Sequence, residues 1–451
     1  MPITGAGESA PTDARVQPRT AARVKRGTRL RHGLYARARQ AVLSDTGLRL
    51  AHAVERTRIL AHLRRSHSRP DPYPAPRELD AVMLPAGGGN IGDQAMFEAY
   101  LASTPGEVLA VMRDAGAYVI PDEDRARVRV LHAPLLSGGT LRGRSAEVRA
   151  LADELRVARS FAVVGADILD GGYNRAEAVT RAEMLRLARR LGADARVLGF
   201  SWGEHVDAAA SRALARAARE ARLFVRDPSS AERLDRAGIP AIESADIVFT
   251  ADGEREPADL SAWVTRLPDP VVIVNLSGLI ERRMDLVPEF VALIDRLTAD
   301  GMRVVLLPHC LRDGDDDLAV CRRAGEAATQ ADRVLLVERA LRPAEVRWLT
   351  ARASAVVTGR MHLSILALTQ GTPVVVLRTR GKVEGLARMF DLERYALDPV
   401  PGIGGEVGSA LAALFADATL RARIEERLPH VRALAQRQFV PEVPERAASP
   451  R

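Results

Sequence analysis

The sequence predicts an α/β protein built from two Rossmann-like halves, and two observations support this prediction. From residue 79 onward, short runs rich in β-branched residues alternate with longer Ala/Leu/Arg segments of helical period. A polar, proline-containing stretch, 251–270, interrupts this alternation once, so two sheets are expected. With 451 residues, 47% of them hydrophobic, the chain is long enough to bury a core around each sheet.

The first alternating block is expected to form a parallel sheet with helices on both faces. Its strands are expected at 80–84, 107–111, 128–132, 160–165, 195–200, 222–225 and 246–249. Its helices are expected near 93–103, 145–158, 176–191, 207–220 and 229–237.

The second block repeats this pattern. Its strands are expected at 271–276, 303–307, 333–337, 354–357 and 373–377. Its helices are expected near 287–299, 315–328, 343–351 and 361–369. Ligands of such sheets bind at the carboxyl ends of the strands, so two halves that face each other across a cleft should share one site.

These patterns divide the chain into four parts. Residues 1–74 are expected to form an Arg-rich N-terminal extension, partly disordered or helical, which ends in a stiff proline-rich linker. Residues 75–265 are expected to form the first Rossmann-like domain and 266–405 the second. In 406–451, a C-terminal helix is expected to pack back on the first domain before a short tail.

The positive charge of the chain is concentrated at its start. Residues 1–70 hold 15 Lys+Arg against 4 Asp+Glu, a net of +11 within a whole-chain net of +7. Since the segment lacks interleaved aromatic residues and any nucleic-acid motif, a solvated tail is the first interpretation and no nucleic acid partner is expected. The alternative is peripheral contact with an anionic membrane, because leucine, valine and isoleucine residues are interspersed with the arginines.

The composition indicates a cytoplasmic protein, with the inner face of the membrane as the place of any peripheral contact. No run of 18 apolar residues occurs, and the first 30 residues lack the apolar core of a signal peptide. The two cysteines, Cys310 and Cys321, indicate neither a disulfide framework nor a metal cluster, so no metal is expected.

The glycine-rich run GGGNIGDQAM follows the first predicted strand. Its glycines let the backbone approach a ligand closely, and the N–H groups around Gly89 and Gly92 favour an anion. Asn90 and Asp93 offer polar groups at the start of a helix expected from near Gln94, and Asp93 could equally serve only as its cap. Many α/β proteins use glycines here only to turn tightly, which is the alternative interpretation.

In a second run, VVTGRMHLS, a strand ends at a glycine and a helix begins with Arg360 and His362. A helix N-terminus, a bidentate cation and a titratable imidazole would converge there on an anion and on a proton to be moved. A buried structural role is the alternative for His362. Lys382, in the loop after the next strand, is the only lysine beyond the extension, which indicates either a need for a compact ammonium or chance survival.

A third run, LFVRDPSS, places Arg226 just beyond a strand. Arg226 is either the salt-bridge partner of Asp227 or a ligand for an anion. Asp227 or Ser229 is the expected N-cap of the helix that follows.

These runs, in this order, resemble the polysaccharide pyruvyltransferase family over roughly residues 79–390. The residues that carry the resemblance are Gly89–Asp93, Val225–Asp227, Ser244–Asp246, Leu306–His309 and Gly359–His362, followed by Gly371, Pro373 and Lys382. Two places depart from the family pattern. Met361 stands where leucine or phenylalanine is usual, and Gly165–Asp170 stands where a run of glycines is usual.

The resemblance implies the fold of B-type glycosyltransferases, in which two Rossmann-like domains face each other across a cleft. It implies transfer of the enolpyruvyl group of phosphoenolpyruvate to two hydroxyls of a sugar, which forms a pyruvate ketal on a cell-surface polysaccharide, an exopolysaccharide or a lipid-linked glycan precursor. No cofactor besides this donor substrate is implied. The implied donor-site residues are Arg226, Arg360, His362 and Lys382, with Gly89, Asn90, Gly92 and Asp93 in the facing wall.

The chemistry of this transfer suits these residue types. Phosphoenolpyruvate carries a carboxylate and a phosphate, which two arginines and a lysine can neutralise and hold. His362 is the candidate general acid for the methylene carbon of the donor, and Asp93 is the weaker candidate for a base. Two other functions stay open, a glycosyltransferase that uses a nucleotide sugar and an inactive glycan-binding or assembly protein.

Overall fold

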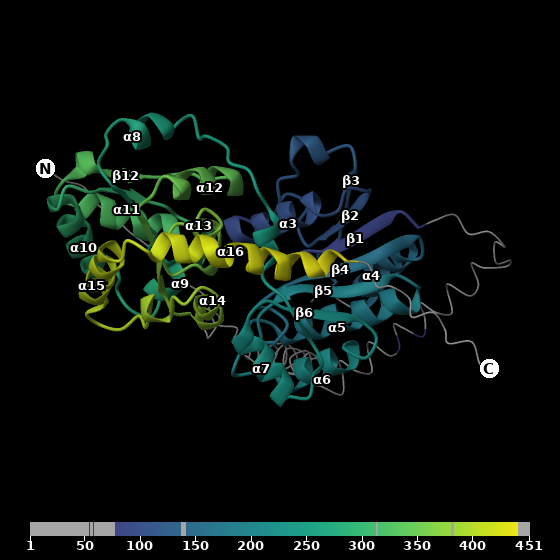
Figure 1. Cartoon of the computed structure of the whole chain (residues 1–451). Coiled ribbons are helices and arrows are strands. Elements are labelled where there is room, and N and C mark those ends of the chain that lie inside the picture. The colour runs from purple at the N-terminus through teal and green to yellow at the C-terminus, as the bar shows by residue number, and fades with distance from the viewer. Residues whose placement is uncertain are drawn as a thin grey trace, which may run out of the picture. The chain divides into compact units, whose positions relative to one another are not determined.

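The computed structural model describes residues 77–136, 141–312, 314–379 and 383–440, together with Val54 and Thr57. Nearly all of the predicted extension and the predicted donor-site residue Lys382 lie outside these ranges. The elements described below belong to one compact unit, Glu55–Arg451. Figure 1 shows two α/β domains in this unit, each built around its own sheet, which confirms the predicted fold class of two Rossmann-like domains.

The first sheet has seven strands in the order β3-β2-β1-β4-β5-β6-β7, and all neighbouring pairs are parallel. Its strands are β1 (Leu79–Met83), β2 (Val108–Met112), β3 (Val128–His132), β4 (Ala158–Ala166), β5 (Asp194–Phe200), β6 (Arg222–Val225) and β7 (Ile242–Glu243). Its helices are α3 (Ile91–Ala102), α4 (Leu141–Leu155), α5 (Arg175–Arg190), α6 (Ala208–Ala217) and α7 (Pro228–Arg236). Every residue of β1 and β2 is buried, as expected for central strands covered on both faces.

The second sheet has six strands in the order β12-β9-β8-β13-β14-β15, again with all pairs parallel. Its strands are β8 (Val271–Val274), β9 (Arg303–Leu306), β12 (Val334–Leu336), β13 (Ala355–Thr358), β14 (Val374–Leu377) and β15 (Ala396–Leu397). Its helices are α9 (Gly278–Glu281), α10 (Val287–Ala299), α11 (Asp317–Ala327), α12 (Pro343–Ala351), α13 (Met361–Leu368) and α14 (Val383–Met389). A short helix, α8 (Ser261–Thr265), lies in the stretch between the two sheets.

Two hydrophobic clusters divide the core along the first sheet. Successive strand residues point to opposite faces, so Ala81 and Met83 belong to one cluster and Val82 to the other. The cluster around Val82 continues through α3 into the strands of the second sheet. Since one cluster reaches both sheets, apolar packing fixes the two domains against each other at the place where their ligand cleft is expected.

The end of the chain returns to the first domain. After α15 (Ile403–Ala416), helix α16 (Leu420–Gln436) leads to Gln438, whose Nε2 donates to Ala245 O over 2.8 Å. Gly199 N in turn donates to Gln438 Oε1 over 2.7 Å. Figure 1 shows α16 running in yellow from the second domain toward the first. Among the described helices, none alone is long and apolar enough to cross a bilayer, and only α15 and α16, which meet at 88°, reach that length and composition together.

Two local expectations were wrong, and several short elements were not anticipated. The expected strand at 246–249 is a 3-10 helix, η2 (Ile247–Thr250), because the Asp246 side chain accepts the Val248 N–H over 3.0 Å and turns the chain. Helix α3 begins at Ile91 rather than near Gln94. A two-stranded hairpin of β10 (Leu311–Arg312) and β11 (Asp315–Asp316) was not anticipated.

Candidate functional site

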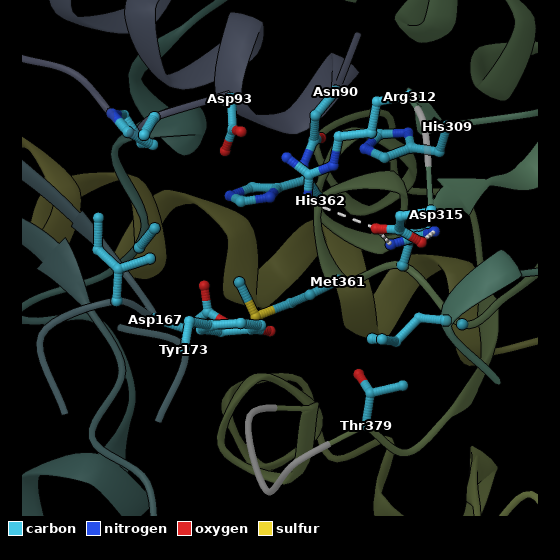
Figure 2. Close-up of a pocket in the computed structure, with 18 of the residues that line it drawn as sticks. Asn90, Asp93, Asp167, Tyr173, His309, Arg312, Asp315, Met361, His362 and Thr379 are labelled. Carbon is cyan, nitrogen blue, oxygen red and sulfur yellow. Dashed lines mark hydrogen bonds and ion pairs between the residues drawn. The ribbon is translucent and has the colours of Figure 1, made fainter. Parts of the chain in front are cut away.

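A pocket of about 410 Å³ lies where carboxyl ends of strands from both sheets meet. Residues that follow β1, β4 and β6 line it from the first domain, and residues that follow β8, β9, β13 and β14 line it from the second. Figure 2 shows side chains from both domains pointing into this space. The pocket brings together five residues predicted from the sequence, namely Asn90, Asp93, Arg226, Arg360 and His362.

The glycine-rich turn joins the two domains. Leu311 N donates to Gly89 O over 2.7 Å, and Ile91 N donates to His309 O over 3.0 Å, so the turn pairs with the segment after β9. Gly89 has a φ of +68°, and a Cβ at this position would overlap the Leu311 carbonyl. Backbone contact between the domains is therefore a sufficient reason for glycine at position 89, without an anion.

The absence of a side chain on Gly92 leaves room for the His362 ring. A Cβ on Gly92 would overlap several atoms of this ring, including Nδ1, so only glycine lets the imidazole lie against the start of α3. His362 is the second residue of α13, two residues after Arg360, which is the N-cap. The first and second predicted runs thus touch each other through Gly92 and His362.

Asn90 and Asp93 have different tasks at the start of α3. Asn90 is the N-cap, because its Oδ1 accepts the Gly92 N–H over 2.8 Å. Asp93 lies three residues further along, so it is not the N-cap, and its buried side chain lines the pocket. Burial raises the pKa of Asp93, while the charges of His362 and Arg312 act in the opposite direction.

The imidazole of His362 lies beside a buried carboxylate. Its Nε2 is 3.3 Å from Asp246 Oδ2, and its side chain is 13% exposed. Burial alone would raise the pKa of Asp246, but the charges of His362 and Arg226 hold it well below its ordinary value. Asp246 therefore stays ionised and can stabilise the imidazole when that ring carries a proton.

Arg226 is buried and pairs with Asp246 rather than with Asp227. Its Nη1 donates to Asp246 Oδ2 over 2.7 Å, and its Nε donates to Ser201 Oγ over 2.8 Å. Asp227 is instead the N-cap of α7, which is one of the two alternatives predicted from the sequence. Arg226 reaches the pocket, and its direct partner is the carboxylate that also faces His362.

Arg360 is held by two aspartates of the hairpin segment. Its Nη1 donates to Asp315 Oδ2 over 3.0 Å, its Nε donates to Asp317 Oδ2 over 3.1 Å, and its Nη2 donates to both side chains. Burial lowers the pKa of Arg360, but the two carboxylates raise it further above its ordinary value. Because Arg360 is paired with two carboxylates, most of its positive charge is already neutralised within the protein.

The basic pocket residues that the sequence reasoning did not predict as ligands include Arg282, His309 and Arg312. His309 stands in the Leu306–His309 run that contributed to the family resemblance, and this was the available signal for it. Arg282 follows the short helix α9, and Arg312 lies on β10, neither of which the sequence pattern predicted. Arginine is so frequent in this chain that an arginine outside a predicted strand end carries no signal.

A model of the polysaccharide pyruvyl transferase family matches residues 140–380, more than half of the 451 residues. The chain belongs to this family. The match contains Arg226, Arg360 and His362, begins after the glycine-rich turn and ends just before Lys382. No curated protein matches the sequence at a significant level.

The fold is shared with solved structures of low sequence identity. A Listeria monocytogenes protein assigned as a UDP-N-acetylglucosamine 2-epimerase aligns with a TM-score of 0.56 at 12% identity, over 80% of this chain and 94% of that one. UDP-GlcNAc 2-epimerase from Neisseria meningitidis, bound to UDP-GlcNAc, aligns with a TM-score of 0.52 at 11% identity, over 80% and 97%. A glycosyltransferase from Rickettsia africae aligns with a TM-score of 0.51 at 9% identity, over 80% and 96%. These likenesses show the two-domain, B-type glycosyltransferase fold.

In this member of the polysaccharide pyruvyl transferase family, Gly165–Asp170 replaces the expected run of glycines. Ala166, at the end of β4, has a φ of +45° and lines the pocket. Glycine adopts such a conformation without steric penalty, whereas alanine is strained in it. The departure therefore falls on a pocket-lining backbone, which continues along the pocket through Asp167 and Ile168.

Proposed function

We propose that this pocket transfers the enolpyruvyl group of phosphoenolpyruvate to two hydroxyls of a sugar, forming a cyclic pyruvate ketal and releasing phosphate. The observation that carries the proposal is the convergence of Asp93, Arg360 and His362 in one pocket of a polysaccharide pyruvyl transferase family member. The proposed acceptor is a cell-surface polysaccharide or its lipid-linked precursor. Phosphoenolpyruvate is the proposed donor, with no further cofactor.

The charges on the two walls of the pocket support a separate position for each substrate. The second-domain wall carries three arginines, Arg282, Arg312 and Arg360, and one carboxylate, Asp315, which is paired with Arg360. The first-domain wall carries three carboxylates, Asp93, Asp167 and Glu177, and one arginine, Arg226, which is paired with Asp246. A donor with a carboxylate and a phosphate fits the arginines of the second-domain wall. Sugar hydroxyls donate hydrogen bonds to carboxylates and therefore fit the first-domain wall.

The reaction needs one proton delivered to carbon and two removed from oxygen. A proton added to the methylene carbon of the donor makes its neighbour electrophilic, and the first sugar hydroxyl attacks there and loses its proton. The carbon–oxygen bond to phosphate then breaks, and the phosphate leaves with the bridging oxygen. The second hydroxyl closes the ketal and loses its proton, one of the two released protons leaving on the phosphate.

His362 and Asp93 are placed for these proton transfers. His362 can deliver the proton to carbon, since the ionised Asp246 beside it stabilises the protonated ring. Asp93 reaches the same pocket from the first domain, where the acceptor is proposed to lie (Figure 2). Because burial raises its pKa, Asp93 takes up a proton more readily than an exposed carboxylate, which suits the base for a sugar hydroxyl.

The test is incubation of the protein with carbon-labelled phosphoenolpyruvate and a panel of lipid-linked and aryl sugars that carry neighbouring hydroxyls. We expect phosphate release that depends on the sugar, with the label recovered in a sugar ketal. A parallel reaction with UDP-sugars tests the glycosyltransferase alternative that the fold also permits. Glycosyl transfer from a UDP-sugar, with no label transferred from phosphoenolpyruvate, would contradict the proposal.

A further inference from the structure

The cations of the pocket differ in how far protein carboxylates already bind them. Arg226 is paired with Asp246, and Arg360 is held by two aspartates. Arg282, by contrast, is exposed and has no ion pair with another described residue. Arg312 reaches Asp315 only at 3.5 Å and is 40% exposed. Within the described pocket wall, the positive charge available for a ligand therefore lies mainly on Arg282 and Arg312.

His309 adds an unsatisfied polar group to the same wall. Its side chain is 1% exposed, and neither ring nitrogen has a hydrogen-bond partner among the described residues. Burial lowers its pKa well below the ordinary value, and the charges of His362 and Arg360 act in the same direction. His309 is therefore neutral and offers one N–H donor that the protein does not use.

The backbone around His309 is firmly held, so the unpartnered ring is not a result of a loose segment. His309 N donates to Asp317 Oδ2 over 3.1 Å, and its carbonyl accepts the Ile91 N–H over 3.0 Å. The next residue, Cys310, also donates its N–H to Asp317 Oδ2 over 3.1 Å. A buried polar group without a partner is unfavourable, and such groups concentrate where a ligand completes the site.

The three side chains belong to the second-domain wall of the pocket. A Cβ on Gly314 would lie 3.9 Å from Arg282 Nη1, which places this guanidinium beside the β10–β11 hairpin. Arg312 belongs to that hairpin, and Figure 2 shows it on the same edge of the pocket as His309. Arg282, His309 and Arg312 thus come from the segments after β8 and β9, which are neighbours in the second sheet.

We propose that Arg282, Arg312 and His309 form the subsite for the phosphate group of the donor. The two guanidinium groups supply charge and paired N–H donors that match phosphate oxygens, and the neutral imidazole supplies a further N–H. Arg360 and His362 then face the carboxylate and the reacting carbon. This inference rests on the proposed function, because it takes phosphoenolpyruvate as the donor.

The first test measures dissociation constants for phosphoenolpyruvate and for inorganic phosphate with the full-length protein by calorimetry. Arg282→Gln and Arg312→Gln should each weaken both ligands by roughly 10- to 100-fold, since a charge-assisted contact is lost. Arg283→Gln is the matched control, because Arg283 is the neighbouring exposed arginine and does not line the pocket. Equal affinities in the wild type and in both pocket variants would overturn the subsite.

The second test separates binding from packing at position 309. His309→Leu removes two unpartnered nitrogens from a buried site, so its melting temperature without ligand should equal or exceed that of the wild type. The melting-temperature rise caused by inorganic phosphate should shrink in the same variant. His309→Gln supplies a second measurement in case leucine does not fit. A lower melting temperature without ligand, together with an unchanged rise on adding phosphate, would show that the ring is structural. That result would contradict the assignment of His309 to the subsite.

The two ligands distinguish failure of the subsite from failure of the proposed function. Binding of inorganic phosphate that depends on Arg282 and Arg312, without binding of phosphoenolpyruvate, would support the subsite and refute the donor. Binding of phosphoenolpyruvate that ignores both arginines would support the donor and refute the subsite. Binding of neither ligand by the wild type would overturn both.

Discussion

Single residues of the pocket act through partners that the fold places beside them. His362 faces the ionised Asp246, whose other partner is Arg226, so these three side chains form one network. Arg360 depends in the same way on Asp315 and Asp317. A substitution at any of these positions therefore changes a network, and stability and rate must be measured together to separate the two effects.

We predict that His362→Gln lowers the rate strongly and stability little. The ring is partly exposed and Asp246 keeps its bond from Arg226, so the melting temperature should fall only slightly. Without a general acid the single-turnover rate should fall by roughly 10²–10⁴-fold while donor binding is retained. Thermal unfolding and single-turnover rate, measured on one preparation, decide this. A variant that is destabilised but fully active would contradict the catalytic assignment.

Asp93→Asn should stabilise the protein at neutral pH and slow the reaction. Burial raises the folded-state pKa of Asp93 above its ordinary value of 3.8, so the folded protein has its full stability below that pH, where the buried carboxyl is protonated. This stability is lost as pH rises through the folded pKa, because a buried carboxylate becomes charged. The melting temperature of the variant should therefore exceed that of the wild type at about pH 8, and the difference should vanish near pH 4. A difference that is constant with pH would show that Asp93 is not desolvated.

Arg360→Lys should be far from conservative. A lysine cannot hold Asp315 and Asp317 with parallel N–H groups, and a buried carboxylate then loses its partner. We expect the free energy of unfolding to fall by roughly 2–4 kcal/mol and turnover to fall with it. Arg283→Lys is the control at an exposed neighbouring arginine outside the pocket. Chemical denaturation that gives wild-type stability for Arg360→Lys would show that the double ion pair is unimportant.

At the scale of elements, the site is held by the glycine-rich turn at the start of α3, the segment after β9 and the start of α13. The turn pairs with the β9 segment through Gly89 and Ile91, and α13 brings His362 against Gly92. One element of the first domain and two elements of the second thus meet at these few residues. Glycine is required at positions 89 and 92 by contacts with other elements more than by the local turn.

Gly92→Ala should therefore resemble a loss of His362. The added Cβ would overlap the imidazole, so the ring must move away from Asp246 while the fold is retained. We expect the rate to fall by at least roughly 10-fold with a modest change in melting temperature. Gly405→Ala is the matched control, because its Cβ would meet no other atom within 4 Å. Normal turnover in Gly92→Ala would contradict the tight fit between this glycine and the ring.

The sequence predicts the positions of the site residues better than their partners. Arg226, Arg360 and His362 are found at strand ends where apolar runs stop, and this local signal is strong. The partner of Arg226 is Asp246, twenty residues away, which the sequence placed before a strand that is in fact a 3-10 helix. Long-range pairs depend on how the sheets are ordered, and no local pattern carries that information. The same reason explains why His309 was recognised only as part of a motif.

At the scale of the whole molecule, two parallel sheets, a shared apolar cluster and the return of α16 keep the two pocket walls in place. Arginines are more numerous than carboxylates on the second-domain wall, and carboxylates are more numerous than arginines on the first-domain wall. Under the proposed function, this arrangement gives an anionic donor and a hydroxylated acceptor separate places around His362 and Asp93. The fold alone is common to enzymes that act on UDP-sugars, so the function must be tested on the chemistry of the donor.

The most direct measurement follows the bridging oxygen of phosphoenolpyruvate labelled with the heavy isotope. Both ketal oxygens come from the sugar in the proposed reaction, so the carbon–oxygen bond of the donor breaks. Mass spectrometry should therefore find the label in the released phosphate and none in the pyruvate ketal. Heavy oxygen retained on the pyruvyl carbon, with unlabelled phosphate, would mean that the phosphorus–oxygen bond breaks and would contradict pyruvyl transfer.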